Sequence, residues 1–141
     1  MSDFNDKVIA DFRKHAGRTP ETLPGRPIML IHTIGARSGQ PRLQPLMFLQ
    51  QGSDAPWHLF ASYGGAPRNP SWFHNIVANP DIEIEVGDGT AIERIAVRGR
   101  VLEGAERDAI YAEMARQWPQ FAGYEEKTTR DTIPVIALTR R

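Results

Sequence analysis

The sequence predicts an α+β protein, a small antiparallel β-barrel of six strands with an N-terminal helix and two further helices. Six short apolar runs are separated by Gly, Pro or Asp turns, which favours neighbouring strands that connect directly. Only three segments have helical periodicity, too few for the crossovers that a parallel sheet requires. No GxGxxG pattern follows a strand, which argues against a dinucleotide-binding Rossmann fold.

Residues 1–27 are expected to form an amphipathic helix and a linker ahead of the main domain, residues 28–141. Apolar side chains recur at helical spacing at Phe4, Val8, Phe12 and Ala16. The predicted helix spans residues 3–16, begins at Ser2 or Asp3 and ends at Gly17. Three prolines then favour an extended linker. The apolar stripe can pack on the barrel, on a partner or on a membrane surface.

The main domain is expected to contain six strands in meander order and two helices. The strands are predicted at 28–34, 43–50, 57–62, 81–86, 91–102 and 133–138, and the helices at 71–78 and 105–117. Residues 81–86 alternate, with Asp81, Glu83 and Glu85 on the side expected to face solvent. Pro134 favours an edge or a first pairing position for the last strand.

The composition excludes several functional classes. The chain has 17 Lys and Arg against 17 Asp and Glu, so it lacks the basic excess of a general nucleic-acid binder. It has no cysteine, which excludes disulfides and agrees with a cytoplasmic location. No apolar run approaches the ~20 residues of a transmembrane helix, and the four histidines lack metal-ligand spacing, so we expect no metal.

Two basic, glycine-containing loops follow predicted strands. The first, residues 33–42, carries Arg37, Ser38 and Arg42, and the second, residues 61–70, carries Arg68 beside two glycines. Glycines let backbone N–H groups turn toward a ligand, and the second loop opens a helix, whose first N–H groups are free. Such loops suit an anion, so we expect a charged small-molecule ligand.

Three blocks of residues give the chain a family resemblance. They are Gly35 to Arg42 with Pro45 and Leu46, Ala61 to Pro70 with Trp72 and Asn75 to Pro80, and Thr129-Arg130 with Ile133 to Val135. With these blocks the chain resembles the deazaflavin-dependent nitroreductase family of small flavin-type oxidoreductases. The resemblance implies an FMN-binding split-barrel-like fold, the deazaflavin coenzyme F-420 as cofactor, and a monomer or a homodimer.

The resemblance also implies a cofactor site in which the first loop takes the anionic tail and Ala61 to Asn69 lies along the ring and the phosphate. The implied contacts are Arg37, Ser38, Gly39, Arg42, Pro45, Ala61, Ser62, Tyr63, Gly64, Gly65, Ala66, Arg68, Asn69 and Trp72. Two basic residues usual in the family are replaced here by Ala36 and Tyr63. Since this loss weakens the attraction for a polyglutamate tail, FMN stays an alternative.

An acceptor pocket is expected beside three aromatic residues, Trp118, Phe121 and Tyr124, which recur every three positions. Pro119 and Gly123 argue against one continuous helix, so we expect an aromatic lid on a loop. Met47 stands where relatives carry a tyrosine and would soften the pocket. Tyr124 is the first candidate for polarising or protonating the acceptor, and Ser62 is the second.

These observations predict an oxidoreductase that transfers hydride from a reduced deazaflavin to a planar, electron-poor acceptor such as a quinone, enone or nitroaromatic. The chain offers few acids, bases or nucleophiles of its own, so a cofactor must supply the chemistry. An FMN-dependent NAD(P)H reductase is one alternative. A non-catalytic carrier of a flavin, lipid or other flat apolar ligand is another.

Overall fold

The computed structural model describes residues 3–141, so the predicted helix start at Ser2 lies outside the described residues. The helices in this range are α1 (Asp3–Lys14), α2 (Ser71–Ala78), α3 (Gly104–Gln117) and α4 (Gln120–Lys127), with a single 3₁₀ turn, η1 (Tyr63–Gly65). The strands are β1 (Ile28–Ile34), β2 (Pro41–Met47), β3 (Leu49–Gln50), β4 (Trp57–Phe60), β5 (Asp81–Gly87), β6 (Ile92–Val101) and β7 (Val135–Arg140). No described helix has the length and apolar character to cross a membrane.

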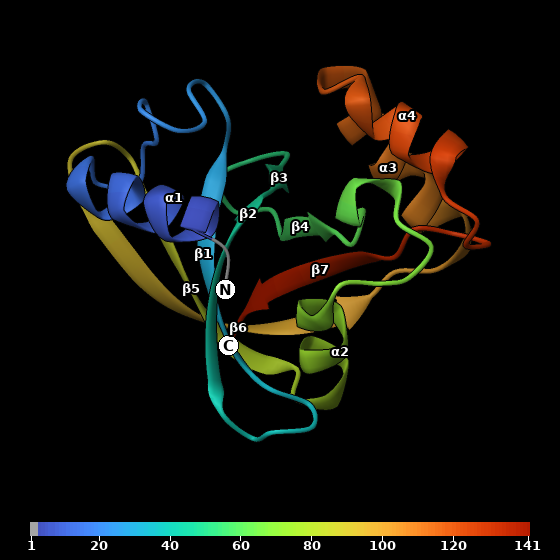
Figure 1. Ribbon diagram of the computed structural model, residues 1–141, viewed down its shortest axis with the longest axis horizontal. Helices are drawn as coiled ribbons and strands as arrows, with labels where there is room; N and C mark the ends of the chain where they lie inside the picture. Colours follow the sequence, from blue (N-terminus) through green and yellow to red (C-terminus); the bar gives the residue numbers. More distant parts are fainter. Residues whose placement is uncertain (1–2) are drawn as a thin grey trace.

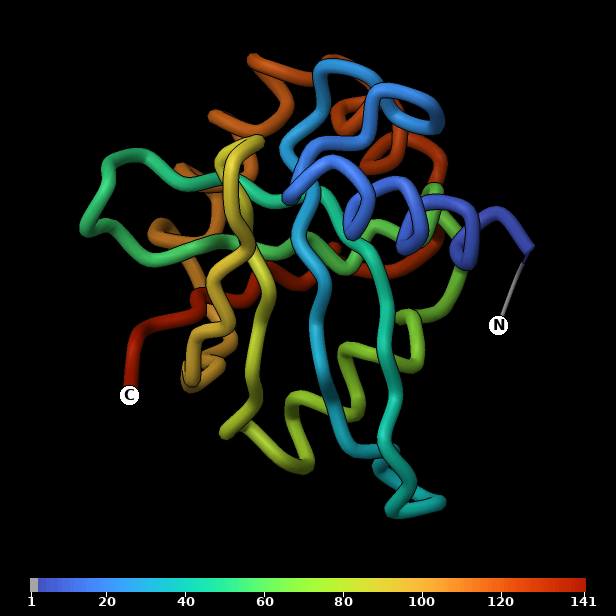
Figure 2. The backbone as a smooth tube through the Cα atoms, turned by 90° about the vertical axis from the view of Figure 1, so that its left-hand side faces the viewer, coloured from blue at the N-terminus to red at the C-terminus, as the bar shows by residue number. Residues whose placement is uncertain are grey.

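All seven strands belong to one antiparallel sheet in the order β2-β1-β5-β6-β7-β4-β3. The edge strands β2 and β3 are consecutive in the chain and separated by Phe48 alone, so the sheet curls back on itself (Figures 1 and 2). The α+β class is therefore confirmed. The six-strand count is wrong, because Phe48 leaves the strand and donates its N–H to the carbonyl of Pro27 at 3.2 Å. The meander order is also wrong, since β7 inserts between β6 and β4.

Three apolar clusters hold the helices against this sheet. The largest closes under α2 and includes Met29, Ile31, Leu59, Trp72, Ile76, Ile84 and Ile136. A second lies under α3 and α4 and includes Phe60, Tyr111, Met114, Phe121 and Ile133. The third joins Val8 and Phe12 of α1 to Ile28 and Leu30 of β1. Val8 and Phe12 of the apolar stripe are thus buried against the sheet, on the opposite side of the molecule from α3 and α4 (Figure 1), while Phe4 is 50% exposed.

Two details of the predicted strands need correction. Glu85 was expected in solvent but is 5% exposed, because α1 covers it. Its carboxylate accepts hydrogen bonds from Arg13 of α1 at 3.0 Å and from His32 of β1 at 2.5 Å. For the last strand the sequence left an edge or a first pairing position open for Pro134, and the structure excludes the edge. β7 lies inside the sheet, and Pro134 directly precedes it and accepts the N–H of Ala61 at 2.9 Å.

The aromatic segment expected as a loop is helix α4. Pro119 is tolerated because it stands at the N-cap, before the helix needs its missing N–H. Gly123 lies inside the helix at a position where an added Cβ meets no atom within 4 Å. The two residues that suggested a loop are therefore compatible with a short helix, and the chain has four α-helices in its described range instead of three.

The linker after α1 is a turn fixed by hydrogen bonds, and the extended segment expected from its prolines is wrong. Leu23 donates its N–H to the carbonyl of Thr19 at 2.9 Å, and the Thr19 hydroxyl returns a bond to Leu23. Asp11, 4% exposed, accepts the backbone N–H groups of Glu21 and Thr22, while His15 bonds its other oxygen at 2.8 Å. These bonds fix the chain between α1 and β1.

Candidate functional site

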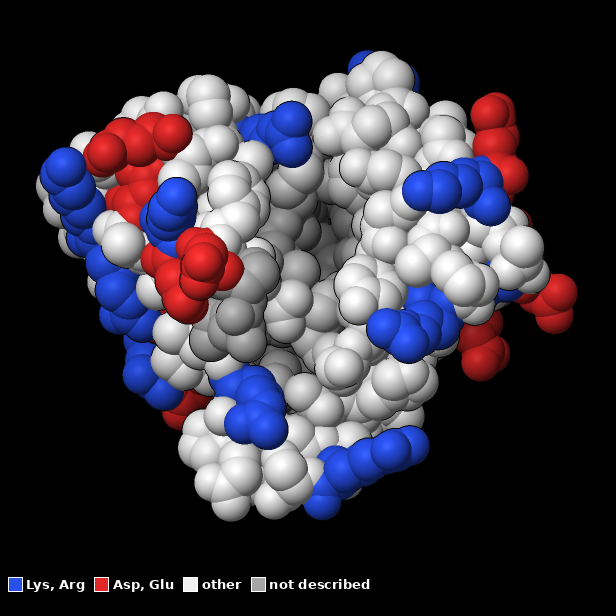
Figure 3. All heavy atoms as spheres, viewed as in Figure 1, with Lys and Arg blue, Asp and Glu red and all other residues white. Residues whose placement is uncertain are grey.

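A cleft of about 200 Å³ lies between α1 with its following turn on one side and β2 with α4 on the other. Its lining residues are Phe4, Asn5, Val8, Leu23, Arg26, Ile28, Pro45, Leu46, Met47, Phe60, Ser62, Gln120, Phe121 and Tyr124. Figure 3 shows the hollow between the two halves of the molecule, with basic side chains around its rim. A mostly apolar cleft with a few polar groups suits a flat ring.

The cleft brings together residues that the sequence placed in different roles. Ser62 and Tyr124, the two candidate catalytic residues, line it together with Met47 and Phe121, both expected near the acceptor. The predicted cofactor residue Pro45 lines it as well. Within residues 3–141, no protein group forms a hydrogen bond with the hydroxyl of Ser62 or Tyr124, so both are free to bond a ligand. Trp118 instead packs against the apolar cluster under α3 and α4.

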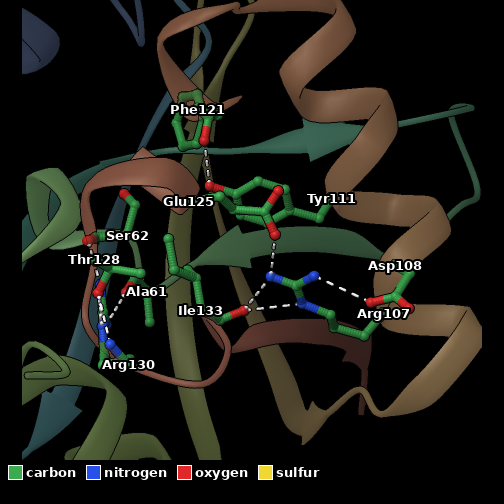
Figure 4. Close-up of polar contacts among 10 residues, drawn as sticks. All are labelled: Ala61, Ser62, Arg107, Asp108, Tyr111, Phe121, Glu125, Thr128, Arg130 and Ile133. Atoms are coloured by element: carbon green, nitrogen blue, oxygen red, sulfur yellow. Dashed lines mark hydrogen bonds and ion pairs between the residues drawn. The ribbon is translucent and has the colours of Figure 1, made fainter. Parts of the chain in front are cut away.

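Arg130 braces the loop of residues 61–69, which was expected to hold the cofactor ring. Its guanidinium donates to the carbonyls of Ala61 at 2.8 Å and Ser62 at 2.7 Å and to Asn69 Oδ1 at 2.6 Å. It also donates to the Thr128 hydroxyl at 2.9 Å, and Figure 4 shows how it reaches from the segment after α4 to Ala61 and Ser62. Burial lowers the pKa of Arg130, but a guanidinium stays protonated.

The sequence prediction did not assign Arg130 to the site. The available signal was its membership of the third block of family residues, Thr129-Arg130. Its partners in the loop lie more than 60 positions away in the chain, so no local pattern connects them to Arg130.

The same loop turns sharply before it reaches α2. Tyr63, Gly64 and Gly65 have φ values of 48°, 62° and 81°, a left-handed conformation that disfavours side chains. A Cβ on Gly65 would lie 3.1 Å from the carbonyl of Tyr124, so glycine permits the close approach of the loop to α4. Tyr63 is 50% exposed, and Arg68 lies 5.9 Å from its ring centroid. The two therefore form an exposed cation–π pair on the loop.

The first basic loop lies directly against α2, which follows the second. Asn75 of α2, 7% exposed, accepts the N–H of Ala36 at 2.9 Å and donates to the Thr33 hydroxyl at 3.3 Å. The N-cap of α2 is Pro70, which has no side chain to bond the first N–H groups of the helix. Unbonded N–H groups at a helix start favour an anion. The two loops that the sequence singled out are therefore neighbours.

The side chains of the first loop are exposed and suit an anionic tail. Arg42 donates to the Ser38 hydroxyl at 3.3 Å and to its neighbour's carbonyl, that of Pro41, at 3.2 Å. Arg37 has no protein partner within residues 3–141. This donor set fits a phosphate and carboxylates. Trp72, by contrast, is 4% exposed and packs in the main core, and its contact with a cofactor stays a prediction.

A buried network behind the cleft fixes α4, which carries Phe121 and Tyr124. Arg107 of α3 donates to the carbonyl of Ile133 at 3.0 and 2.9 Å and to Glu125 of α4 at 3.1 Å (Figure 4). The Tyr111 hydroxyl donates to the carbonyl of Phe121 at 2.6 Å, and burial raises the pKa of Tyr111. The side chains of α3 therefore position Phe121 and Tyr124 of α4 beside the cleft.

The geometry agrees with comparisons to known proteins. The sequence profile of a family described as F420H(2)-dependent quinone reductase matches residues 6–140. The chain belongs to that family. It is 38% identical to the F420H(2)-dependent quinone reductase Rv1261c of Mycobacterium tuberculosis over an alignment of 141 positions that covers 94% of this chain and 87% of the relative.

Solved structures of relatives share the fold. The chain is similar to an F420-H2 dependent reductase, FDR-A, with a TM-score of 0.66, 37% identity, and coverage of 80% of this chain and 94% of the other. It is also similar to a protein solved as a domain-swapped dimer, with a TM-score of 0.67, 32% identity and 94% coverage of each chain. The family resemblance inferred from the sequence is confirmed, and the family members are oxidoreductases.

Proposed function

We propose that this protein transfers hydride from reduced coenzyme F-420 to a quinone bound in the cleft. The observation that supports this most strongly is the convergence of the free hydroxyls of Ser62 and Tyr124 on one apolar cleft, beside the loop braced by Arg130. The name of the family, F420H(2)-dependent quinone reductase, contains both the cofactor and the acceptor. Enones and nitroaromatics are further acceptors with the same flat, electron-poor chemistry.

The roles of the residues follow from their places. Arg37, Ser38 and Arg42 hold the anionic tail, while Ala61 to Asn69 lies along the ring. The bound reduced deazaflavin supplies the hydride. Apolar walls exclude water, and Tyr124, assisted by Ser62, donates a proton to the acceptor oxygen, so that the quinone gains one hydride and one proton and becomes a hydroquinone.

The proposal keeps coenzyme F-420 over FMN despite Ala36 and Tyr63. Each missing exposed charge weakens binding by roughly 1 kcal/mol or less, and Arg37, Arg42 and Arg68 remain at the two loops. We further propose that the curled sheet is the family's split barrel, with residues 28–141 as the cofactor domain and residues 1–27 as an N-terminal helix and linker. The related domain-swapped dimer favours a homodimer, and the composition favours the cytoplasm.

The test separates acceptor chemistry from cofactor binding. Tyr124→Phe removes only a hydroxyl, so cofactor affinity should change by less than about threefold, while quinone turnover should fall at least tenfold, roughly 1.4 kcal/mol of barrier. Fluorescence titration measures the first and a steady-state assay the second. Phe121→Leu is the companion variant, because Phe121 also packs in the core and a smaller change keeps the fold.

Tyr111→Phe measures how much of any loss comes from a displaced α4, since the Tyr111 hydroxyl bonds only the carbonyl of Phe121. A folded Tyr124→Phe protein with full turnover would remove Tyr124 from the reaction. Ligand binding without turnover of any acceptor in the wild type would instead make the protein a carrier.

A further inference from the structure

Among the described residues that line the cleft, Arg26 is the only charged one. It stands just before β1, at the mouth, and its side chain is exposed. Figure 3 shows basic atoms at the upper end of the hollow, over the segment that joins α1 to β1. The neighbouring walls are apolar, with Val8, Leu23 and Ile28 nearby in the lining. A single cation at the end of an apolar slot favours a ligand that is flat and negatively charged at one end.

The guanidinium of Arg26 has no protein partner within residues 3–141. In that range almost every other arginine is engaged, for example Arg13 with Glu85, Arg100 with Glu106 and Arg107 with Glu125. The one other arginine without a protein partner there is Arg37, at the predicted phosphate end of the cofactor site. Both unpaired guanidinium groups therefore border the ligand site.

The backbone that carries Arg26 is held in place. Its N–H donates to the carbonyl of Leu23 at 3.3 Å, and Leu23 is in the turn closed with Thr19. The carboxylate of Asp11 accepts the backbone N–H groups of Glu21 and Thr22 in the same turn. Fixing the backbone lowers the entropy that Arg26 loses when it binds a ligand.

Arg26 cannot serve the phosphate end of the cofactor. The seven residues of β1 separate it from the loop that carries Arg37, and a strand of that length spans about 20 Å. The two positions lie at opposite ends of β1 (Figure 1). Arg26 therefore belongs to the acceptor end of the cleft, with Met47 and Tyr124.

We propose that Arg26 selects acceptors, favouring quinones that carry an anionic oxygen, such as a carboxylate or an ionised ring hydroxyl. The inference rests on the proposed function for the identity of the acceptor, and it deepens that function by naming an acceptor class. Arg26 binds the anionic oxygen by a charge-assisted hydrogen bond and so orients the ring in the slot. It does not take part in the transfer itself.

The experiment compares a naphthoquinone carboxylate with its uncharged carboxamide. Isothermal titration calorimetry measures binding of each to the protein with oxidised coenzyme F-420 present and absent. The wild type should prefer the carboxylate at least tenfold. Arg26→Gln should lose that preference with little change for the carboxamide, Arg26→Lys should restore part of it, and added salt should weaken it.

Arg18→Gln is the matched control, because Arg18 is in the same segment but donates to the carbonyl of Asp88 at 2.9 Å, away from the cleft. It should leave the preference unchanged. Equal affinity of the wild type for both quinones, or equal losses in Arg26→Gln and Arg18→Gln, would overturn the proposal.

The turnover assay distinguishes this failure from that of the proposed function. If reduced coenzyme F-420 turns over with the uncharged quinone and the protein shows no preference for the carboxylate, the proposed role of Arg26 is wrong and the proposed function stands. Preference without turnover removes the proposed reaction and keeps the anion site.

Discussion

Replacing Arg130 should loosen the cofactor loop and weaken cofactor binding. Its guanidinium bonds the carbonyls of Ala61 and Ser62 and the side chain of Asn69. Arg130→Ala removes all three bonds and leaves the carbonyl of Ala61, a fully buried residue, without its Arg130 partner. Arg130→Lys keeps the charge, but an ammonium cannot reproduce the planar set of donors.

The magnitude follows from these bonds. A hydrogen bond to a charged group contributes about 1.5–3 kcal/mol, and bonds that share one side chain do not add fully. We expect Arg130→Ala to lower the free energy of unfolding by roughly 3 kcal/mol, and Arg130→Lys by about half of that. A loss of ~3 kcal/mol lowers Tm by roughly 10 °C in a domain of this size. Cofactor affinity should fall at least tenfold.

Calorimetry gives the Tm of each variant, and a fluorescence titration gives its cofactor dissociation constant. Arg116→Ala is the control, since Arg116 is exposed and pairs only with Glu113 and should leave both quantities unchanged. The reasoning is refuted if Arg130→Lys binds the cofactor as tightly as the wild type. A variant with reduced Tm but unchanged affinity would show that the loop does not hold the ring.

Three further predictions concern the anchor, the altered loop residue and the acid stability. Arg42→Ala should weaken coenzyme F-420 by roughly 1–3 kcal/mol in a low-salt titration, and an unchanged constant there and in Arg37→Ala would remove the anchor. Tyr63→Lys should tighten polyglutamated coenzyme F-420 more than FMN; no gain for either would show that Tyr63 does not face the tail. Burial raises the pKa of Asp11, but hydrogen bonds from Thr22, Glu21 and His15 outweigh it and lower that pKa below 3.8. The stability from Asp11 is therefore present above pH 3.8 and is lost as pH falls through the lowered value. Thermal melts across this range should show a smaller acid loss in Asp11→Asn, and identical pH profiles would contradict the assignment.

The sequence was sufficient where local pattern decides the structure. β1 and α2 have the predicted bounds, residues 28–34 and 71–78, because their apolar spacing and flanking breakers are unambiguous. The sequence was also sufficient to assign the two basic loops to one anionic ligand, because each follows a strand and each carries glycine and arginine. The contact that brings the two loops together is the hydrogen bond between Ala36 and Asn75, which are 39 positions apart in the chain.

The sequence was insufficient where a distant contact overrides the local pattern. Glu85 has the alternation of a solvent-facing residue, but α1 packs over it and supplies Arg13. The strand break at Phe48 comes from a bond to Pro27. α4 was missed because Pro119 and Gly123 were treated as breakers, although the first is at a helix start and the second faces open space. No local pattern connects Arg130 to the loop, since its partners there are all more than 60 positions away in the chain.

The proposed reaction in the cleft is the reduction of a quinone by reduced coenzyme F-420. The direct measurement mixes the purified protein with reduced coenzyme F-420 and a naphthoquinone under exclusion of oxygen, and follows the absorbance of the reoxidised deazaflavin. We expect protein-dependent reoxidation with one hydroquinone formed per cofactor, and none when FMN with NADPH replaces the deazaflavin. Turnover with FMN and NADPH, or reoxidation of the deazaflavin no faster than without protein, would contradict the proposed reaction.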